Sequence, residues 1–305
     1  MTTILPVPRE VRMALDRLKS LGEGDLGVLD VVACGGQTVA PLRAFLFERE
    51  PSGKTLRTEL AFYVGCLNAQ AALAAKEQPT CFPSPTQMGE CRLSFRGLYD
   101  VSLALNSSGR AVGNDLDADG KRLLVVTGAN QGGKTTYLHG VGQAQLMMQA
   151  GMFAPANSFG ADLRDRIFTH FKREEDASMN SGKLDEELLR ISDMVEQMTH
   201  HSLALFNESF AATNDREGSE INRQIVSALI ESGIKVVAVT HLYEFARKFY
   251  DTHLKDAISL RADRREDGTR TFKVREGEPL LTLYSPEALA TEQEFLLAMK
   301  AQRTA

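Results

Sequence analysis

Apolar residues in the part of the chain that follows residue 120 fall into two alternating patterns. Short, mainly apolar runs, each the length of a buried strand, lie at 123–126, 167–169, 202–206 and 234–240. Apolar residues at helical spacing lie at 137–148, 184–198 and 221–230. Strands and helices that alternate along a chain form mostly parallel sheets with helices on both faces, so we predict an α/β fold here.

The preceding residues have a different pattern, which is helical at first and then irregular. Helical spacing predicts a short helix over 8–20 and a long amphipathic helix over 55–77. Prolines follow the second helix and end it, and the alternation over 90–105 allows short strands. We therefore expect a mainly helical segment at this end of the chain.

A polar, turn-rich segment at 114–120 separates the two patterns. It predicts a boundary between a smaller segment, 1–118, and a larger domain, 119–305. Within the larger domain, Asp267-Gly268 indicates a hairpin turn between two strands, and we expect a helix after this hairpin.

Composition describes an ordinary globular protein. The 305 residues are 43% hydrophobic and 25% charged, with a formal net charge of −5 and no block of Lys or Arg. Contact with DNA would therefore need a local patch or a partner protein, since the overall field repels phosphate. The four cysteines lack C-x-x-C spacing, and no apolar run is long enough to span a bilayer. We expect a cytoplasmic protein without a membrane segment or a zinc site.

The residues most suggestive of chemistry follow the apolar run 123–126. They read Gly128-Ala129-Asn130-Gln131-Gly132-Gly133-Lys134-Thr135-Thr136 and match the P-loop spacing G-x-x-x-x-G-K-[ST]. In such a loop the glycines let the backbone wrap a polyphosphate, and the N–H groups of the following helix point at it. Lys134 would reach the β- and γ-phosphates, and Thr135 would offer a hydroxyl to Mg²⁺. The alternative is a glycine-rich turn before a helix.

Two further strand ends carry candidate catalytic groups. Asn207-Glu208 ends one apolar run and His241 follows another. Ligands bind at the carboxyl ends of parallel strands, so Glu208 is a candidate general base beside the loop. Asn207 offers an oxygen to Mg²⁺ without a negative charge, and His241 is placed to sense the γ-phosphate. The alternatives are an Asn-Glu pair that opens a loop and a structural histidine.

Residues from about 119 to 285 resemble the ATPase domain of the MutS family of DNA mismatch repair proteins, which are ABC-type ATPases. The stretch 127–138 is similar to the family's TGPNMGGKSTYL, with Ala129 in place of Pro and Gln131 in place of Met. Further similar segments, in chain order, are 151–155 to GxFVPA, 165–169 to DRIFTR, 205–208 to LMDE, 212–218 to GTSTxDG and 240–241 to the end of ATH.

The resemblance implies roles for particular residues. ATP-binding residues would be Gly128, Asn130, Gly132, Gly133, Lys134, Thr135 and Thr136. Thr135 and Asn207 would hold Mg²⁺, while Glu208 and His241 would be catalytic. Residues that would meet the nucleotide of a second subunit are the signature Ser181-Gly182-Lys183 together with Thr213 and Asn214. The family's SGRST becomes SGKLD here, so ordinary capping of the helix that follows is the alternative.

The resemblance implies a homodimeric, Mg²⁺-dependent ATPase that acts with DNA and leaves three functional classes to compare. The first is this ATPase. In this case residues 1–118 are loosely similar to the family's helical lever, and the chain is a short member of the family or a fragment of a longer one. The second is a nucleotide-gated scaffold with little turnover. The third is a DNA-end or recombination ATPase of the ABC class, which the lack of coiled-coil heptads disfavours.

Overall fold

The computed structural model describes residues 54–172, 182–211, 213–265 and 267–279. Contacts divide the chain into two compact units, Met1–Ala71 and Ala72–Ala305. Helix α3 (Lys54–Ala75) confirms the long helix predicted over 55–77. The helices predicted over 8–20 and after the hairpin lie outside the described residues. Among the described residues, no helix is long and apolar enough to cross a membrane.

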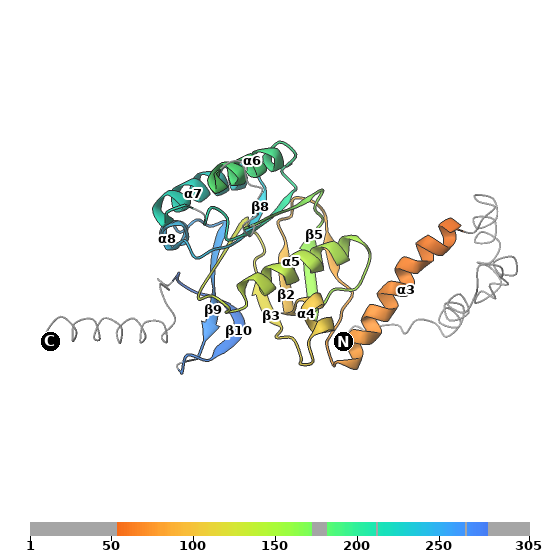
Figure 1. Ribbon diagram of the computed structural model, residues 1–305. Helices are drawn as coiled ribbons and strands as arrows, with labels where there is room; N and C mark the ends of the chain where they lie inside the picture. Colours follow the sequence, from red (N-terminus) through yellow and green to blue (C-terminus); the bar gives the residue numbers. More distant parts are fainter. Residues whose placement is uncertain (1–53, 173–181, 212, 266, 280–305) are drawn as a thin grey trace, which may run out of the picture. The chain divides into compact units, whose positions relative to one another are not determined.

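The second unit is built around a six-stranded sheet with the order β10-β9-β4-β8-β7-β6 (Figure 1). Its strands are β4 (Leu123–Thr127), β6 (Ile167–Phe171), β7 (Leu203–Asn207), β8 (Lys235–Val239), β9 (Ala257–Arg264) and β10 (Arg270–Glu276). β4 pairs in parallel with β8 and β9, and β7 pairs in parallel with β6 and β8. β9 and β10 form the antiparallel hairpin predicted around Asp267-Gly268. The α/β class is thus confirmed.

Helices cover both faces of this sheet. They are α5 (Lys134–Gln149), α6 (Lys183–Val195), α7 (Asp215–Glu231) and α8 (Tyr243–Asp251). Successive side chains of β4 point to opposite faces, so Leu124 packs in one core with Leu138 of α5. Leu123 packs in a second core with Val226 of α7 and Phe245 of α8. Every residue of β4 is buried, which explains why its sequence is a continuous apolar run.

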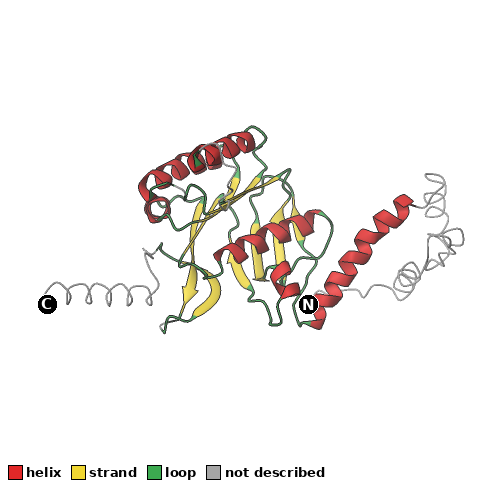
Figure 2. Cartoon of the chain, viewed as in Figure 1, coloured by secondary structure: helices red, strands yellow, loops and turns green. Residues whose placement is uncertain are grey.

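A second, four-stranded sheet has the order β1-β5-β2-β3 (Figure 2). Its strands are β1 (Ser84–Thr86), β2 (Leu93–Leu98), β3 (Asn114–Asp117) and β5 (Ser158–Asp162). Phe95 of β2 and Phe159 of β5 are buried in the same core as α5, and their rings stack at 6.2 Å. Strands from both sides of residue 118 therefore share one sheet and one core, and the division of the chain by contacts falls between Ala71 and Ala72.

The structure differs from the sequence prediction in several short elements, and strands β1 and β5 are among those that were not expected. The segment 114–117, expected as part of a polar linker, is strand β3, in which Asn114 and Leu116 are buried. The second half of the alternating segment 90–105 is not a strand but the short helix α4 (Val101–Asn106), which Asp100 caps. Helix α8 was not expected, although its buried Phe245 and Phe249 have helical spacing.

Candidate functional site

The loop between β4 and α5 presents the start of a helix to the solvent. Gly133 is the N-cap of α5, with φ of 92°, a value that glycine adopts without strain. No side chain among the described residues caps this helix. The first N–H groups of a helix have no partner within the helix and carry partial positive charge, so this end of α5 is suited to an anion.

Two other glycines of the loop allow β9 to approach closely. A Cβ atom on Gly128, whose φ is 121°, would lie 3.0 Å from the nitrogen and from Cβ of Ala262. A Cβ atom on Gly132 would lie 2.9 Å from Cβ of Ala262 and 2.9 Å from the carbonyl oxygen of Ala129. The loop therefore rests directly on β9, and its path depends on the absence of side chains at both positions.

Lys134 is buried within the loop. Its Nζ donates to the carbonyl oxygens of Gly128 at 2.6 Å and Ala129 at 3.3 Å, and lies 3.5 Å from Oδ1 of Asn130. Nζ also lies 3.8 Å from Oε1 of Glu208. Burial lowers the pKa of Lys134, and the charge of Glu208 acts in the opposite direction. The structure thus brings Asn130, Lys134 and Glu208 together, as the sequence predicted.

The two residues predicted to hold a metal ion contact each other. Oγ1 of Thr135 donates to Oδ1 of Asn207 at 3.1 Å, which places two oxygen atoms at the junction of α5 and β7. The described residues contain no cluster of three or more His, Cys, Asp or Glu side chains that could hold a metal. Mg²⁺ commonly takes only one or two protein oxygens and completes its shell with phosphate and water. The pair fits such a site.

Glu208 and His241 form the other half of the site. Oε2 of Glu208 accepts hydrogen bonds from the backbone nitrogen of His241 at 3.2 Å and from Nδ1 of its ring. Burial alone would raise the pKa of Glu208, but the hydrogen bonds and charge of His241, together with Lys134, hold it below the ordinary value. The hydrogen bond to Glu208 raises the pKa of His241. The two side chains are an ion pair at the edge of the loop.

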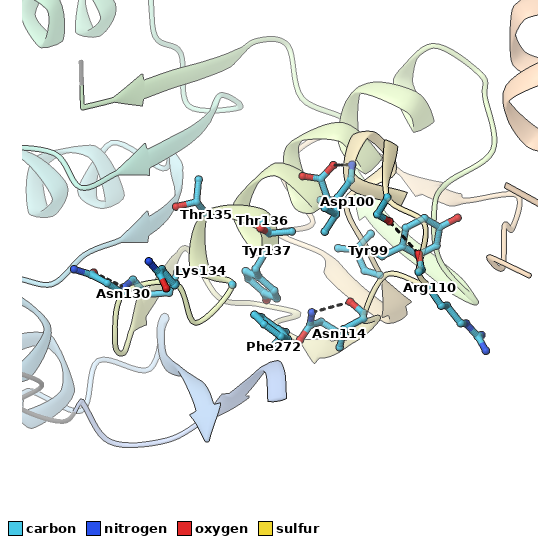
Figure 3. A pocket seen from close by; sticks show the side chains of 18 of the residues that line it. Tyr99, Asp100, Arg110, Asn114, Asn130, Lys134, Thr135, Thr136, Tyr137 and Phe272 are labelled. Atoms are coloured by element: carbon cyan, nitrogen blue, oxygen red, sulfur yellow. Dashed lines mark hydrogen bonds between the residues drawn. The ribbon is translucent and has the colours of Figure 1, made fainter. Parts of the chain in front are cut away.

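A cavity of about 740 Å³ opens beside the loop (Figure 3). One part of its lining comes from the loop and α5, including Asn130, Lys134, Thr135 and Thr136, and Glu208 also reaches it. The other part comes from residues that the sequence analysis did not identify, which are Leu98, Tyr99, Asp100, Leu103, Ser107, Gly109, Arg110, Val112, Asn114, Tyr137, Gly140 and Phe272. These residues lie on β2, α4, β3, α5, β10 and the segments that connect them.

Two aromatic residues are prominent in this second part of the cavity. Phe272 is exposed at the hairpin, and the Oη atom of Tyr137 is buried with no hydrogen-bond partner among the described residues. Burial raises the pKa of Tyr137, so its hydroxyl stays protonated. The exposed aromatic face of Phe272 is suited to a flat ligand.

Of the residues predicted to meet a second subunit, Gly182, Thr213 and Asn214 do not line this cavity. Ser181 lies outside the described residues, and Gly182 is the N-cap of α6. Asn214 caps α7, because its Oδ1 accepts a hydrogen bond from the nitrogen of Glu217 at 2.9 Å, and Thr213 contacts the carboxylate of Glu217. Their proposed role toward a second subunit remains a prediction.

Comparison with known proteins places this geometry in context. Residues 124–279 match the family model described as MutS domain V. The chain is 33% identical over 178 residues to the Endonuclease MutS2 of Thermus thermophilus, which covers 58% of this chain and 22% of that protein. It is 28% identical over 217 residues to the DNA mismatch repair protein MutS of Shouchella clausii, which covers 70% of this chain and 25% of that protein. It thus spans about a quarter of the length of these relatives.

Proposed function

The chain belongs to the MutS family, and from this premise we propose that it binds ATP with Mg²⁺ and hydrolyses it. Members of this family are ATPases, and the family includes mismatch repair proteins. The observation that carries the proposal is the convergence of Lys134, Thr135, Asn207, Glu208 and His241 from α5, β7 and the end of β8. In this reading the loop from Gly128 to Gly133 is a P-loop.

Each of these residues has a distinct task in the proposed reaction. Lys134 and the N–H groups at the start of α5 would hold the phosphates. Thr135 and Asn207 would hold Mg²⁺, which neutralises charge on the phosphates and orients them. Glu208 would orient a water molecule and accept its proton, and His241 would hold Glu208 through the ion pair. The lowered pKa of Glu208 keeps its carboxylate ionised, which suits it to orient a water molecule.

The cavity beside the loop supports a place for the nucleoside. A nucleotide with its phosphates at the start of α5 would extend into the cavity, where Phe272 offers an aromatic face to the base. Tyr137 and Arg110 also line this part of the cavity. A cavity of about 740 Å³ is within the range of sites for small molecules.

We also propose that two copies associate around bound nucleotide and that this state is coupled to DNA. The support is the family membership and the similarity to the DNA mismatch repair protein MutS of Shouchella clausii. Because the net charge is −5, contact with DNA would come from a local patch or from a partner.

Two substitutions test the ATPase proposal. Lys134→Ala should abolish ATP binding, measured with a fluorescent nucleotide. Glu208→Gln should keep binding and lower phosphate release by about 100-fold or more. Turnover should be measured without DNA and with duplex, mismatched and branched DNA, since stimulation by one of these would identify the ligand. Equal turnover in the wild type and Glu208→Gln would refute the role of Glu208.

A second candidate function is a nucleotide-gated scaffold with little turnover. Asn207 favours it, because this residue brings no negative charge to the oxygen pair at Thr135. A single-turnover assay across a Mg²⁺ titration separates the two functions. Association of two copies with ATP, but without phosphate release at any Mg²⁺ concentration, would support the scaffold.

A further inference from the structure

The backbone on the carboxyl side of Glu208 has an unusual conformation. Glu208 has φ of 54° and Phe210 has φ of 58°, so two residues with side chains lie in the left-handed region within three positions. Such residues keep this conformation only where the surrounding structure holds them. Phe210 is fully buried, which anchors its ring, but the peptide groups on either side need contacts of their own.

A carboxylate from α6 supplies one of these contacts. Oε2 of Glu187 accepts a hydrogen bond from the backbone nitrogen of Phe210 at 2.8 Å, and Glu187 is only 4% exposed. Burial raises the pKa of Glu187, whereas the hydrogen bond from Phe210 and the charge of Arg190 act against this rise. A buried carboxylate is costly unless it is hydrogen-bonded, so this contact satisfies both the carboxylate and the strained peptide.

A second chain of hydrogen bonds reaches Ser209 from the same helix. Nη2 of Arg190 lies 3.0 Å from Nε2 of His170, and Nδ1 of His170 lies 2.7 Å from Oγ of Ser209. A guanidinium only donates, so this contact makes Nε2 the acceptor and places the ring proton on Nδ1, where it points at Ser209. His170 is fully buried on β6. Helix α6 therefore holds both residues that follow Glu208.

We propose that Glu187 is a positioning residue for Glu208, and that the chain from Arg190 through His170 to Ser209 supports it. This inference rests on the proposed function, since it gives α6 control over the group that would accept the proton from water. Among the described residues, Glu187 neither lines the cavity nor contacts Lys134, so its action on the reaction passes through the backbone of 208–210.

Four variants test this role. Glu187→Ala removes the acceptor and should lower kcat by about 10- to 100-fold while the Kd for ATP stays within about twofold, because a small displacement of a catalytic group is costly. Glu187→Gln keeps an acceptor oxygen and should keep kcat within about threefold. Ser209→Ala should lower kcat about 3- to 10-fold and gives a reading if Glu187→Ala fails to fold. Asp193→Ala, an exposed acid on the same helix, is the control and should change nothing.

Exchange of the Phe210 amide hydrogen gives a reading that does not depend on turnover. Protection should fall in Glu187→Ala and persist in Glu187→Gln. Unchanged kcat in Glu187→Ala, or an equal loss in Glu187→Gln, would overturn the positioning role while the ATPase proposal stands. A wild type without turnover would instead refute the proposed function, and the exchange measurement would still decide whether Glu187 holds the loop.

Discussion

Glu208 is subject to two opposing influences that decide its protonation state. Its burial favours the neutral acid, whereas His241 and Lys134 favour the carboxylate, and the carboxylate prevails. Glu208 and His241 could be identified from sequence, because each follows an apolar run that forms a buried strand. Their contact could not, since it depends on the left-handed turn at Glu208 that folds the carboxylate back toward His241.

The ion pair predicts a pH dependence of stability. The pKa of His241 is raised from 6.5, so its contribution is complete below pH 6.5 and is lost as pH rises through the raised value. The pKa of Glu208 is lowered from 4.5, so its contribution is complete above pH 4.5 and is lost as pH falls through the lowered value. His241→Ala should therefore cost most stability between pH 4.5 and 6.5.

We expect this cost to be about 1 kcal/mol at most, because the imidazole is 39% exposed and solvent screens the pair. The measurement is urea unfolding of both proteins at pH 5.5 and 8.5. A difference that grows toward pH 8.5 would contradict the assignment.

Because Asn207 is uncharged, we predict that the site binds Mg²⁺ weakly and that a single substitution should strengthen this binding. Asn207→Asp places a negative charge 3.1 Å from the hydroxyl of Thr135, where the metal would bind. Attraction between a carboxylate and a hard cation should lower the Mg²⁺ concentration for half-maximal ATP binding by roughly 3- to 10-fold. The measurement is nucleotide binding across a Mg²⁺ titration. An unchanged Mg²⁺ requirement would remove Asn207 from the metal shell.

The N-termini of helices α5 and α7 differ in whether a side chain caps them. α5 begins at Gly133 without a side-chain cap, whereas α7 begins at Asn214, whose side chain caps it. The open start is suited to a ligand and the capped start to stability. The start of α5 could be predicted from the P-loop spacing. The apolar pattern placed the start of α7 at residue 221, because its first turn from Asp215 is polar, and Asn214 was assigned to a second subunit and not to a cap.

Capping of α7 predicts a measurable loss of stability. Asn214→Ala removes the acceptor for the nitrogen of Glu217 and should lower the free energy of unfolding by about 1 kcal/mol. Asn214→Ser is the matched control, because serine also caps helices, and it should lose only a few tenths of that amount. Thermal unfolding without nucleotide provides the comparison, and equal losses in both variants would show that the cap is not the cause.

We predict that the β9–β10 hairpin binds the base through Phe272. Phe272→Ala removes the aromatic face and should raise the Kd for ATP roughly tenfold, a typical cost for the loss of one stacked base. Inorganic triphosphate lacks a base, so its affinity in a competition assay should not change. Equal weakening of both ligands would mean that the substitution disturbs the loop instead.

The strands of the six-stranded sheet could be predicted from sequence, whereas β1, β3, β5 and helix α8 could not. The apolar runs of β4, β7 and β8 are continuous because these strands are buried on both faces. β3 was missed because its buried Asn114 is polar, and its role is tertiary: Oδ1 accepts a hydrogen bond from the nitrogen of Val274 at 2.7 Å. No local pattern reports a contact between positions 160 residues apart.

For the whole molecule, the proposed reaction links nucleotide state to association. If two copies close around ATP, arrest of hydrolysis should prolong the closed state, as binding stabilises whichever state holds the ligand. Glu208→Gln with ATP and Mg²⁺ should therefore sediment as a dimer, whereas Lys134→Ala should remain a monomer under the same conditions. Sedimentation velocity makes the comparison, and identical behaviour of the two variants would refute nucleotide-driven association.

The contact between the loop and the hairpin has a further consequence. Ala262, on which Gly128 and Gly132 rest, pairs with Val274 of β10, two residues from Phe272. The β9–β10 hairpin thus contacts the phosphate loop through Ala262 and lines the cavity through Phe272. A base that stacks well on Phe272 would hold the hairpin, and with it the phosphate loop, in one position. A base that stacks poorly would leave the loop less ordered. The identity of the base would then affect how tightly the loop binds the triphosphate.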